Sequence, residues 1–429
     1  MKSTSRRNTA FFAAALVAFL PVLLARHAYA DIPLHRDVSL LTTHDLLLTS
    51  APEDFAAEFD KVLQTVQDHF WDKQLGGVDW KKTGDTYRAK LKDVKTKSDF
   101  TALVNRMLEE LHSSHTAYIN DDDVEFYMLP AVMARDMEEH RVTHIGVMGK
   151  ERGGAYIVSA VLDGGPAQKA GIHAGDMILT ADGGPFTTSG SFRGKEGKQV
   201  ELAVKRAGST STETVNVVPI KQNQLRAFLS ATRASAHIMN VQGKRIGYVH
   251  LWTMANDNFK SALDNIMVNQ LHDTDGLILD LRDGFGGIPF GYMDVFTRPD
   301  VAWESQYRGG EPNVSHTGYN KPMVVLINEG TRSAKEFLSY QFKSSHRALL
   351  VGKQTAGAFL GAGSFPISDS GLLEMAIVGL KVDGIKLEQD GVRPDVEVEP
   401  KDSYTEHDQQ MKVAEDRLVQ QLTKPAVAE

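Results

Sequence analysis

The sequence predicts a multidomain protein of mixed class, in which a helical N-terminal segment and a small β module precede an α/β core. Apolar residues recur at helical spacing before residue 118, and short strands alternate with Gly-rich turns over residues 143–220. After residue 245, strand-length apolar runs alternate with helical stretches. A chain of 429 residues also exceeds what one hydrophobic core normally holds, which favours two or three domains.

Residues 1–30 have the pattern of an export signal. A basic start precedes an apolar run over residues 11–25, which is too short to span a bilayer, and Ala28-Tyr29-Ala30 is a small-x-small cleavage motif. We expect cleavage after Ala30 and a periplasmic mature protein beginning at Asp31. The absence of cysteine is compatible with an oxidising compartment.

Composition argues against several classes of partner. The formal charge is −8 and becomes more negative without the signal, which disfavours nucleic acid and anionic lipid as ligands. No later segment is apolar enough to predict a membrane span. The chain has no cysteine ligands, no HExxH motif and no clustered histidine spacing, so we expect no metal site and no cofactor. The oligomeric state is not predicted.

Residues 53–118 are predicted to be helical, within an N-terminal domain over residues 31–128. Apolar side chains recur there at the spacing that buries one face of a helix. Asp99 is placed to cap the second helix. The two runs are Phe55, Phe59, Val62, Leu63 and Val66, then Phe100, Leu103, Val104, Met107, Leu108 and Leu111.

Residues 140–221 form the predicted β module, with strands at 144–147, 155–161, 176–179, 200–205 and 214–218 and a short helix over 166–171. The stretches Gly164-Gly-Pro-Ala167 and Ala170-Gly-Ile-His-Ala-Gly-Asp-Met-Ile178 resemble the PDZ family. The resemblance implies that peptide ends add as a strand to a sheet edge. It also implies a carboxylate-binding loop and strand made of His144, Ile145, Gly146 and Val147. A module that only spaces or gates the fold is the alternative.

The α/β core is predicted over residues 241–400, after a connector at 222–240. Its expected strands are 246–251, 276–281, 323–328 and 348–351, with helices over 258–270 and from Ser333. Such alternation favours crossover connections and a largely parallel sheet. The tail, residues 401–429, is charged and helix-prone, and we expect it to pack outside the core.

Ser333 is the candidate nucleophile of this core. It follows an apolar strand and a Gly-containing turn, at the start of a helical stretch. Free N–H groups and the helix dipole at that position can stabilise a developing oxyanion. Serine is also a common helix N-cap, so this segment alone leaves the two roles equally open.

Five segments of the chain resemble the carboxyl-terminal processing (tail-specific) serine peptidases. They are Leu279-Asp-Leu-Arg282 with Gly286-Gly287, then residues 328–336, 351–357, 391–396 and 111–118. The resemblance implies a ClpP/crotonase-like core and an endopeptidase that acts near the C-termini of proteins or peptides.

The family has two catalytic arrangements. In the tail-specific branch a lysine is the general base, but the corresponding position here is Ala358. The tricorn-like branch uses a histidine oriented by a serine and a glutamate, and Ser114, His115 and Glu388 stand at those positions.

This resemblance assigns the candidate site residues. Ser333 would attack, His115 would take its proton, and Ser114 and Glu388 would orient the imidazole. The N–H of Ala334 and that of Gly286 or Gly287 would form the oxyanion hole.

Two other readings of the same sequence stay open. A non-catalytic carrier of an apolar ligand or peptide could use the same fold, as in the retinoid-binding repeats that resemble this family. A Ser–Lys peptidase could use Lys353 as its base. Arg332 also departs from the family pattern, because a small residue usually precedes the serine. Its cation could narrow the substrate pocket or favour an acidic group there.

Overall fold

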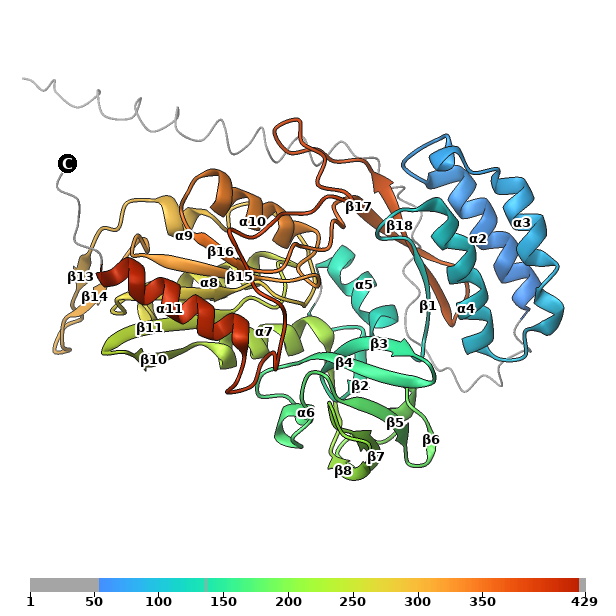
Figure 1. The fold of residues 1–429 in the computed structure, drawn as a ribbon, viewed down its shortest axis with the longest axis horizontal. Coiled ribbons are helices and arrows are strands. Elements are labelled where there is room, and N and C mark those ends of the chain that lie inside the picture. The colour runs from blue at the N-terminus through green and yellow to red at the C-terminus, as the bar shows by residue number, and fades with distance from the viewer. Residues whose placement is uncertain (1–53, 136, 424–429) are drawn as a thin grey trace, which may run out of the picture. The chain divides into compact units, whose positions relative to one another are not determined.

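Four clusters of buried apolar side chains organise the part of the chain that this computed structural model describes, residues 54–135 and 137–423. One cluster lies in the helical N-terminal segment, one in the PDZ-like module, and two on opposite faces of the core sheet. The three expected modules follow one another in the expected order (Figure 1). The predicted export signal lies outside the described residues.

The N-terminal segment is helical to residue 111 and then becomes a strand. Its helices bury Phe59 and Phe100 against an antiparallel sheet of order β1–β18–β17. The helical prediction for residues 117 and 118 is therefore wrong, because both pair with β18. The bounds are α2 Phe55–His69, η1 Leu75–Gly77, α3 Trp80–Arg88, η2 Leu91–Asp93, α4 Lys97–Leu108, η3 Glu109–Leu111, β1 Ala117–Asn120, β17 Gly361–Pro366 and β18 Gly371–Val378.

The capping prediction for the helix α4 needs one correction. Thr96 is the N-cap, and its hydroxyl accepts a hydrogen bond of 3.1 Å from the Asp99 N–H. The Asp99 carboxylate reaches back to the Thr96 N–H at 3.0 Å. The two residues form a reciprocal capping box, so Asp99 supports the helix start from its third position.

The PDZ-like module is an antiparallel sheet of order β3–β4–β5–β7–β8, with β6 paired to β5. The predicted strand over 144–147 is split, because Gly146 has a φ of 77° and turns the chain. His144 ends a separate strand, β2, and Val147 begins β3. The bounds are β2 Arg141–His144, β3 Val147–Arg152, β4 Ala155–Val161, α6 Pro166–Lys169, β5 Met177–Ala181, β6 Gly184–Pro185, η4 Gly190–Phe192, β7 Val200–Lys205, β8 Thr212–Val217 and β9 Ile220–Asn223.

The predicted connector at residues 222–240 is folded structure. It begins in β9, which pairs with β2, and continues as α7 (Gln224–Ser235) and β10 (His237–Val241). Leu225 and Phe228 of α7 are fully or almost fully buried in the same cluster as Met128 and Leu129 of α5 (Val124–Ala134). Its apolar face and polar outer face are an amphipathic pattern that was visible in the sequence.

The core sheet has the order β10–β11–β12–β15–β16–β19 and is parallel except for the β10–β11 pair. The prediction of a largely parallel sheet is confirmed. A small hairpin, β13–β14, leaves the core between β12 and β15. The bounds are β11 Lys244–His250, α8 Asp257–Asn265, η5 Ile266–Gln270, β12 Gly276–Asp280, α9 Asp294–Thr297, β13 Trp303–Ser305, β14 Asn313–Ser315, β15 Met323–Ile327, α10 Ala334–Ser344, β16 Leu349–Gly352, β19 Val396–Glu397 and α11 Gln409–Thr423.

Alternate residues of the central strands face two different layers. Val325 and Ile327 of β15 join the cluster that includes α8 and α10, whereas Val324 and Leu326 pack with Leu418 of α11. The C-terminal helix therefore covers one face of the sheet (Figure 1), so it is part of the core and not an outer appendage. Within the described residues, no helix is long and apolar enough to cross a membrane.

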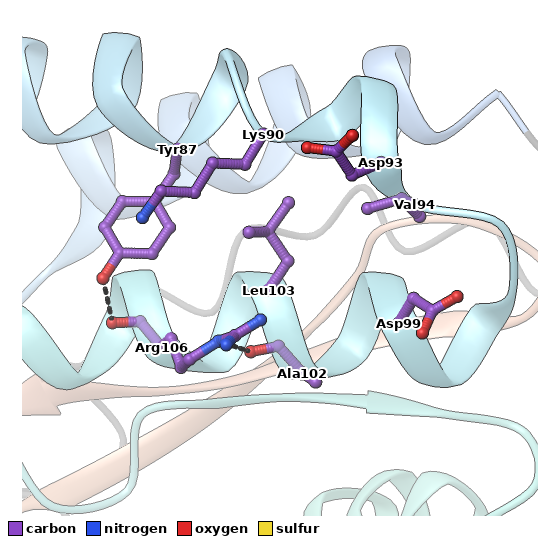
Figure 2. Close-up of a pocket in the computed structure, with 8 residues that line it drawn as sticks. All are labelled: Tyr87, Lys90, Asp93, Val94, Asp99, Ala102, Leu103 and Arg106. Carbon is purple, nitrogen blue, oxygen red and sulfur yellow. Dashed lines mark hydrogen bonds between the residues drawn. The ribbon is translucent and has the colours of Figure 1, made fainter.

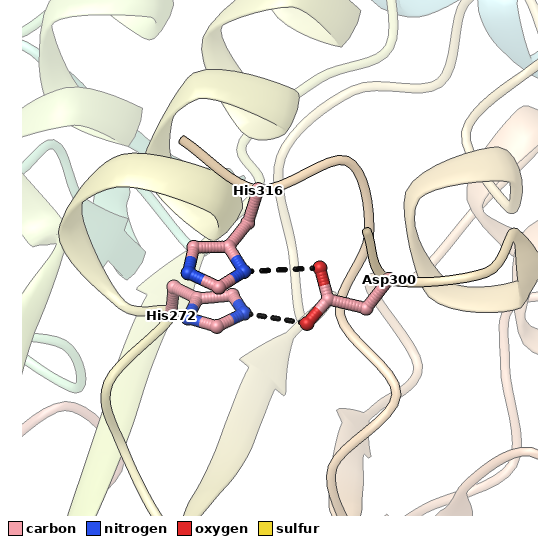
Figure 3. Close-up of side chains that lie close together, drawn as sticks. All are labelled: His272, Asp300 and His316. Carbon is pink, nitrogen blue, oxygen red and sulfur yellow. Dashed lines mark hydrogen bonds and ion pairs between the residues drawn. The ribbon is translucent and has the colours of Figure 1, made fainter. Parts of the chain in front are cut away.

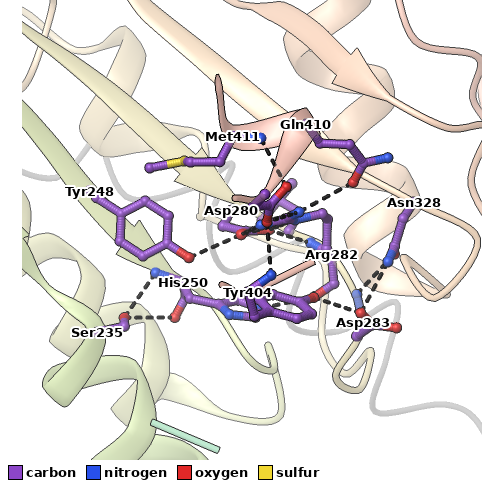
Figure 4. A network of polar contacts seen from close by, with 12 residues as sticks. Ser235, Tyr248, His250, Asp280, Arg282, Asp283, Asn328, Tyr404, Gln410 and Met411 are labelled. Atoms are coloured by element: carbon purple, nitrogen blue, oxygen red, sulfur yellow. Dashed lines mark hydrogen bonds and ion pairs between the residues drawn. The ribbon is translucent and has the colours of Figure 1, made fainter. Parts of the chain in front are cut away.

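A buried polar network joins the end of β12 to the C-terminal segment (Figure 4). Arg282, which is 1% exposed, donates to Asp280 at 2.6 Å and to Asp408 at 2.7 Å, and its guanidinium lies over the Tyr404 ring. The Tyr404 hydroxyl donates to Asp283, which also holds Asn328. Buried charges are tolerated when each is paired in this way. The network fixes the chain just before the Gly286-Gly287 loop.

We predict that Arg282→Ala lowers the free energy of unfolding by about 3–5 kcal/mol, because it leaves Asp280 and Asp408 buried without their partner. Urea denaturation followed by circular dichroism measures the change. Arg417→Ala, at an exposed arginine of α11, is the control and should shift stability by less than about 1 kcal/mol. Equal stabilities of the two variants would contradict the role given to Arg282.

Candidate active site

Ser333 sits at a strained turn between β15 and α10. Its φ of 56° and ψ of −127° are rarely adopted by a residue with a side chain. Two hydrogen bonds hold this conformation, from the Ser333 N–H to the Glu336 carboxylate and to the Ala358 carbonyl, each 3.0 Å long. A sharp strand-to-helix turn of this kind exposes a serine hydroxyl above the sheet.

The Glu336 carboxylate is the hub of this turn. It is fully buried and also accepts from the Thr355 hydroxyl at 2.6 Å, the Gly357 N–H at 2.7 Å and the Ala358 N–H at 2.8 Å. Burial raises its pKa, and these hydrogen bonds oppose the rise. The sequence analysis did not identify Glu336, although its spacing from Ser333 is that of a capping box.

Two of the predicted oxyanion-hole residues, Gly286 and Ala334, lie beside Ser333. A Cβ atom added to Gly286 would stand 2.4 Å from the Ser333 Cβ and 3.2 Å from the Ala334 nitrogen, so only glycine fits. In the described part of the chain, the N–H groups of Ala334, Gly286 and Gly287 have no hydrogen-bond acceptor. Free N–H donors converging near a serine are what an oxyanion requires.

Lys335 supports the glycine loop from beneath. Its Nζ donates to the Asp283 carbonyl at 2.6 Å and to the Arg282 carbonyl at 3.3 Å. The side chain is fully buried, and burial lowers its pKa to about 7. Because it bonds to the loop's carbonyls, Lys335 holds the loop and does not face the serine.

Ser114, His115 and Glu388 form a hydrogen-bonded chain. The His115 Nδ1 lies 2.9 Å from the Ser114 Oγ, and that hydroxyl donates to the Glu388 Oε2 at 2.9 Å. Glu388 also accepts from the Ser114 N–H at 3.0 Å and from the Phe359 N–H at 2.7 Å. The structure therefore brings together three predicted site residues from two distant parts of the sequence.

The positive charge of Arg332 acts electrostatically on the imidazole of His115. Burial, and after it the Arg332 cation, lowers the pKa of His115 to about 3. Arg332 also lies over the Phe285 ring and opposes the burial that raises the pKa of Glu374 to about 6. His115 is thus held as a neutral imidazole, the form that can accept a proton.

Two consecutive residues connect the nucleophile side to the histidine side. Ala358 accepts from the Ser333 N–H, and Phe359 donates to Glu388. Over the described residues, no hydrogen bond joins His115 directly to Ser333. Catalytic contacts of this kind often tighten only when substrate binds.

Lys353, the alternative base, is engaged elsewhere. Its Nζ lies 2.8 Å from Glu397 and 2.6 Å from Glu399. These two carboxylates raise its pKa, which favours the protonated form. A lysine in that state cannot accept a proton from a serine hydroxyl.

The predicted peptide-binding residues lie at one edge of the PDZ-like sheet. Strand β3 pairs only with β4 among the described strands, so it is an edge strand of this sheet. The carbonyls of Ile145 and Gly146 accept from Ala167 and Leu162, whereas their N–H groups have no acceptor in the described structure. His144, Ile145, Gly146 and Val147 are all buried, so a peptide would reach this backbone only after a local rearrangement.

Two cavities lie outside the serine turn. The larger, about 420 Å³, opens between α3 and α4 and is lined by residues 87–106 (Figure 2), none of which belongs to the candidate site. The smaller, about 210 Å³, is lined by Glu388, Ser113 and the neighbouring aromatic Trp71, so it lies behind the hydrogen-bonded chain of His115.

The fold also assembles a histidine cluster that the sequence analysis missed. His272, Asp300 and His316 lie together, with their candidate ligand atoms within 4.8 Å of one another (Figure 3). The expectation that the protein has no metal site stays a prediction, and this cluster is the place where it can be tested. The three residues are far apart along the chain, and their spacing matches no local motif.

Three family models match successive parts of the chain. Residues 245–398 match the model of peptidase family S41, residues 51–109 the tricorn protease C1 domain, and residues 143–217 a PDZ domain. The α/β core is that of peptidase family S41. It is accordingly a serine peptidase of the C-terminal processing group, and proteins are its class of substrate.

Relatives of this S41 peptidase come from both branches of the family. It is 26% identical to the chloroplastic C-terminal processing peptidase of Tetradesmus obliquus, covering 80% of this chain and 77% of that protein. It is also 26% identical to tricorn protease homolog 1 of Streptomyces coelicolor, covering 82% of this chain but only 34% of that protein. A solved photosystem II D1 C-terminal processing protease aligns with a TM-score of 0.49 at 24% identity, over 81% of this chain and 94% of that one.

Proposed function

We propose that this S41 peptidase is an exported endopeptidase that cleaves proteins near their C-termini by tricorn-like chemistry. Ser333 is the nucleophile, His115 the general base, and Ser114 and Glu388 orient the base. The observation that carries the proposal is the hydrogen-bonded chain from Glu388 through the Ser114 hydroxyl to the His115 Nδ1.

That chain sets the tautomer of the base. A serine hydroxyl has one proton to donate, and Ser114 gives it to the Glu388 carboxylate. The Ser114 oxygen must then accept the Nδ1–H of His115, which leaves Nε2 without a proton. Nε2 is therefore the atom that takes the Ser333 proton.

The reaction follows from these positions. As Ser333 Oγ bonds to the scissile carbonyl carbon, its proton moves to the His115 Nε2, and the carbonyl oxygen gains negative charge. The N–H groups of Ala334 and Gly286 or Gly287 donate to that oxygen. His115 then gives the proton to the leaving amine, which departs and leaves an acyl-enzyme on Ser333. In the second half of the reaction His115 takes a proton from water as the water attacks the acyl carbon, and it returns that proton to Ser333 Oγ.

We predict that Ser333→Ala and His115→Ala both lose nearly all peptide hydrolysis, by several orders of magnitude in kcat, because each removes a member of one catalytic unit. Lys353→Ala should retain activity. Casein turnover, with circular dichroism to confirm folding, measures all three. Loss of activity in Lys353→Ala with activity kept in His115→Ala would establish the Ser–Lys alternative instead.

The lowered pKa of His115 predicts the pH profile. Hydrolysis needs neutral imidazole, so activity should persist well below the ordinary imidazole value of 6.5 and fall only as His115 becomes protonated at lower pH. Arg332→Gln removes the cation that lowers this pKa, so the acid limb of kcat/KM should move to higher pH. Arg332→Lys keeps the charge and is the control. If the acid limb of kcat/KM does not move in Arg332→Gln, the Arg332 cation does not lower the pKa of His115.

We propose in addition that the PDZ-like module docks the substrate C-terminus and acts on the oxyanion loop. The Gly146 carbonyl accepts from the Leu162 N–H, and the next residue, Asp163, accepts from the Trp252 Nε1 at 2.9 Å. The Trp252 carbonyl accepts from the Phe285 N–H, which directly precedes Gly286. A movement of the carboxylate-binding loop would therefore shift Asp163 and Trp252 and, through them, the backbone of Phe285. Gly286, whose N–H is a proposed oxyanion donor, would move with Phe285.

We predict that one peptide is cleaved faster with a free C-terminal carboxylate than with an amidated one. Trp252→Phe removes the bond to Asp163 and should reduce this ratio of rates, while Trp303→Phe, at an exposed tryptophan of β13, should not. Single-turnover rates on the matched peptides measure the effect. Equal rates for the two peptides in the unaltered enzyme would rule out carboxylate docking.

Export is proposed on the strength of the signal-like residues 1–30. Cleavage after Ala30 would deliver the peptidase to the periplasm. We predict that the mature protein begins at Asp31, which amino-terminal sequencing of the periplasmic fraction checks. A chain recovered only in the cytosol and starting at Met1 would contradict export.

A further inference from the structure

We propose that His272, Asp300 and His316 form a binding site for a divalent first-row transition metal, with Zn²⁺ as the representative ion. The His272 Nε2 lies 2.8 Å from one carboxylate oxygen of Asp300, and the His316 Nδ1 lies 3.3 Å from the other. Figure 3 shows both rings presenting a nitrogen to the same carboxylate. Two imidazoles and one carboxylate are a ligand set that zinc accepts, with further positions left for water.

The separations suit one ion. Ligand atoms around tetrahedral zinc lie about 3.3–3.5 Å apart, given bond lengths of about 2.0–2.2 Å. The two histidine–carboxylate distances are 2.8 and 3.3 Å, and all three ligand atoms lie within 4.8 Å of one another. Small side-chain rotations would therefore enclose an ion, with no change in the backbone.

His272 has the outer partner that a metal-binding histidine normally has. Its other nitrogen, Nδ1, lies 3.3 Å from the carboxylate of Asp273. With a metal on Nε2, the single proton of the neutral ring is on Nδ1 and donates to Asp273. Such carboxylate partners fix the ring and strengthen the ligand.

The cluster is partly enclosed and open to entry. The side chains of His272, Asp300 and His316 are 11%, 16% and 22% exposed. The two rings stack with centroids 3.3 Å apart, an arrangement that two imidazolium cations would oppose by repulsion. A shared metal ion keeps both rings neutral and supplies the positive charge that Asp300 faces.

The location indicates a structural role. His272 lies just before β12 and His316 lies before β15, at the opposite ends of these strands from Arg282 and Ser333. Asp300 and His316 flank the β13–β14 hairpin at its two roots. A metal held by all three residues would fasten the hairpin to the loop that enters the core sheet.

The test uses the full chain carrying Ser333→Ala, which prevents self-cleavage, purified without a polyhistidine tag and stripped with chelator. Calorimetric titration with Zn²⁺ should show one ion bound per chain. Co²⁺ should give the visible absorption of a low-symmetry nitrogen–oxygen site. Neither readout depends on peptidase activity, so failure here leaves the proposed function untouched.

Variants assign the ion to these residues. His316→Gln and the isosteric Asp300→Asn should abolish the one-site binding, and Asp273→Asn should weaken it by about 10–100-fold. His346→Asn, at an exposed histidine outside the cluster, is the control and should bind as the parent does. Circular dichroism establishes that each variant is folded.

Limited proteolysis tests whether the metal ion holds the β13–β14 hairpin against the core. Arg308 lies between the two hairpin strands, and trypsin cleavage there should slow when Zn²⁺ is added to the parent but not to Asp300→Asn. Absence of one-site binding in the parent would overturn the proposal. Undiminished binding in His316→Gln and Asp300→Asn would overturn it equally, by assigning the ion to other ligands.

Discussion

The geometry of the active site depends on one buried carboxylate. Glu336 receives hydrogen bonds from the N–H of Ser333 and from residues 355–358, so it holds the nucleophile turn and the neighbouring segment together. The backbone conformation of Ser333 costs about 1–3 kcal/mol of free energy, and it persists because the surrounding hydrogen bonds hold it. Phe359, next along the held segment, then fixes Glu388. Ser333 and the hydrogen-bonded chain of His115 are thereby held by contiguous backbone.

Buried ionisable groups of this peptidase are paired with an opposite charge, held by neutral hydrogen-bond donors, or uncharged. Arg282 and Asp280 satisfy one another inside the core, whereas His115 and Lys335 have lowered pKa values because burial disfavours their cations. Burial disfavours an uncompensated charge in both cases, but the ion pair stays charged and the imidazole becomes neutral. Paired ions fix the loop before Gly286, and an unpaired imidazole remains available as a base.

The sequence alone predicted secondary structure correctly where the pattern of apolar residues was local and periodic. The strands 155–161 and 200–205 have the predicted bounds, and the apolar alternation of the core predicted a largely parallel sheet. The pairing of Ser114 and His115 with Glu388 was anticipated only through family resemblance, because no local pattern joins residues so distant. Glu336 was overlooked although its capping-box spacing was visible. The cluster at His272 could not be foreseen, since it arises from the way a hairpin returns to the sheet.

The order of the parts along the chain has a consequence for biosynthesis. His115 and Ser114 are made early, Ser333 much later, and Glu388 close to the end, yet the hydrogen-bonded chain needs the first and the last of these. The sheet β1–β18–β17 imposes the same requirement, because β1 has no partner until residues 371–378 have emerged. A polypeptide that ends before residue 388 therefore contains Ser333 and His115 but lacks the carboxylate that accepts from Ser114. The hydrogen-bonded chain from Glu388 through Ser114 to His115 can therefore form only when synthesis is almost complete.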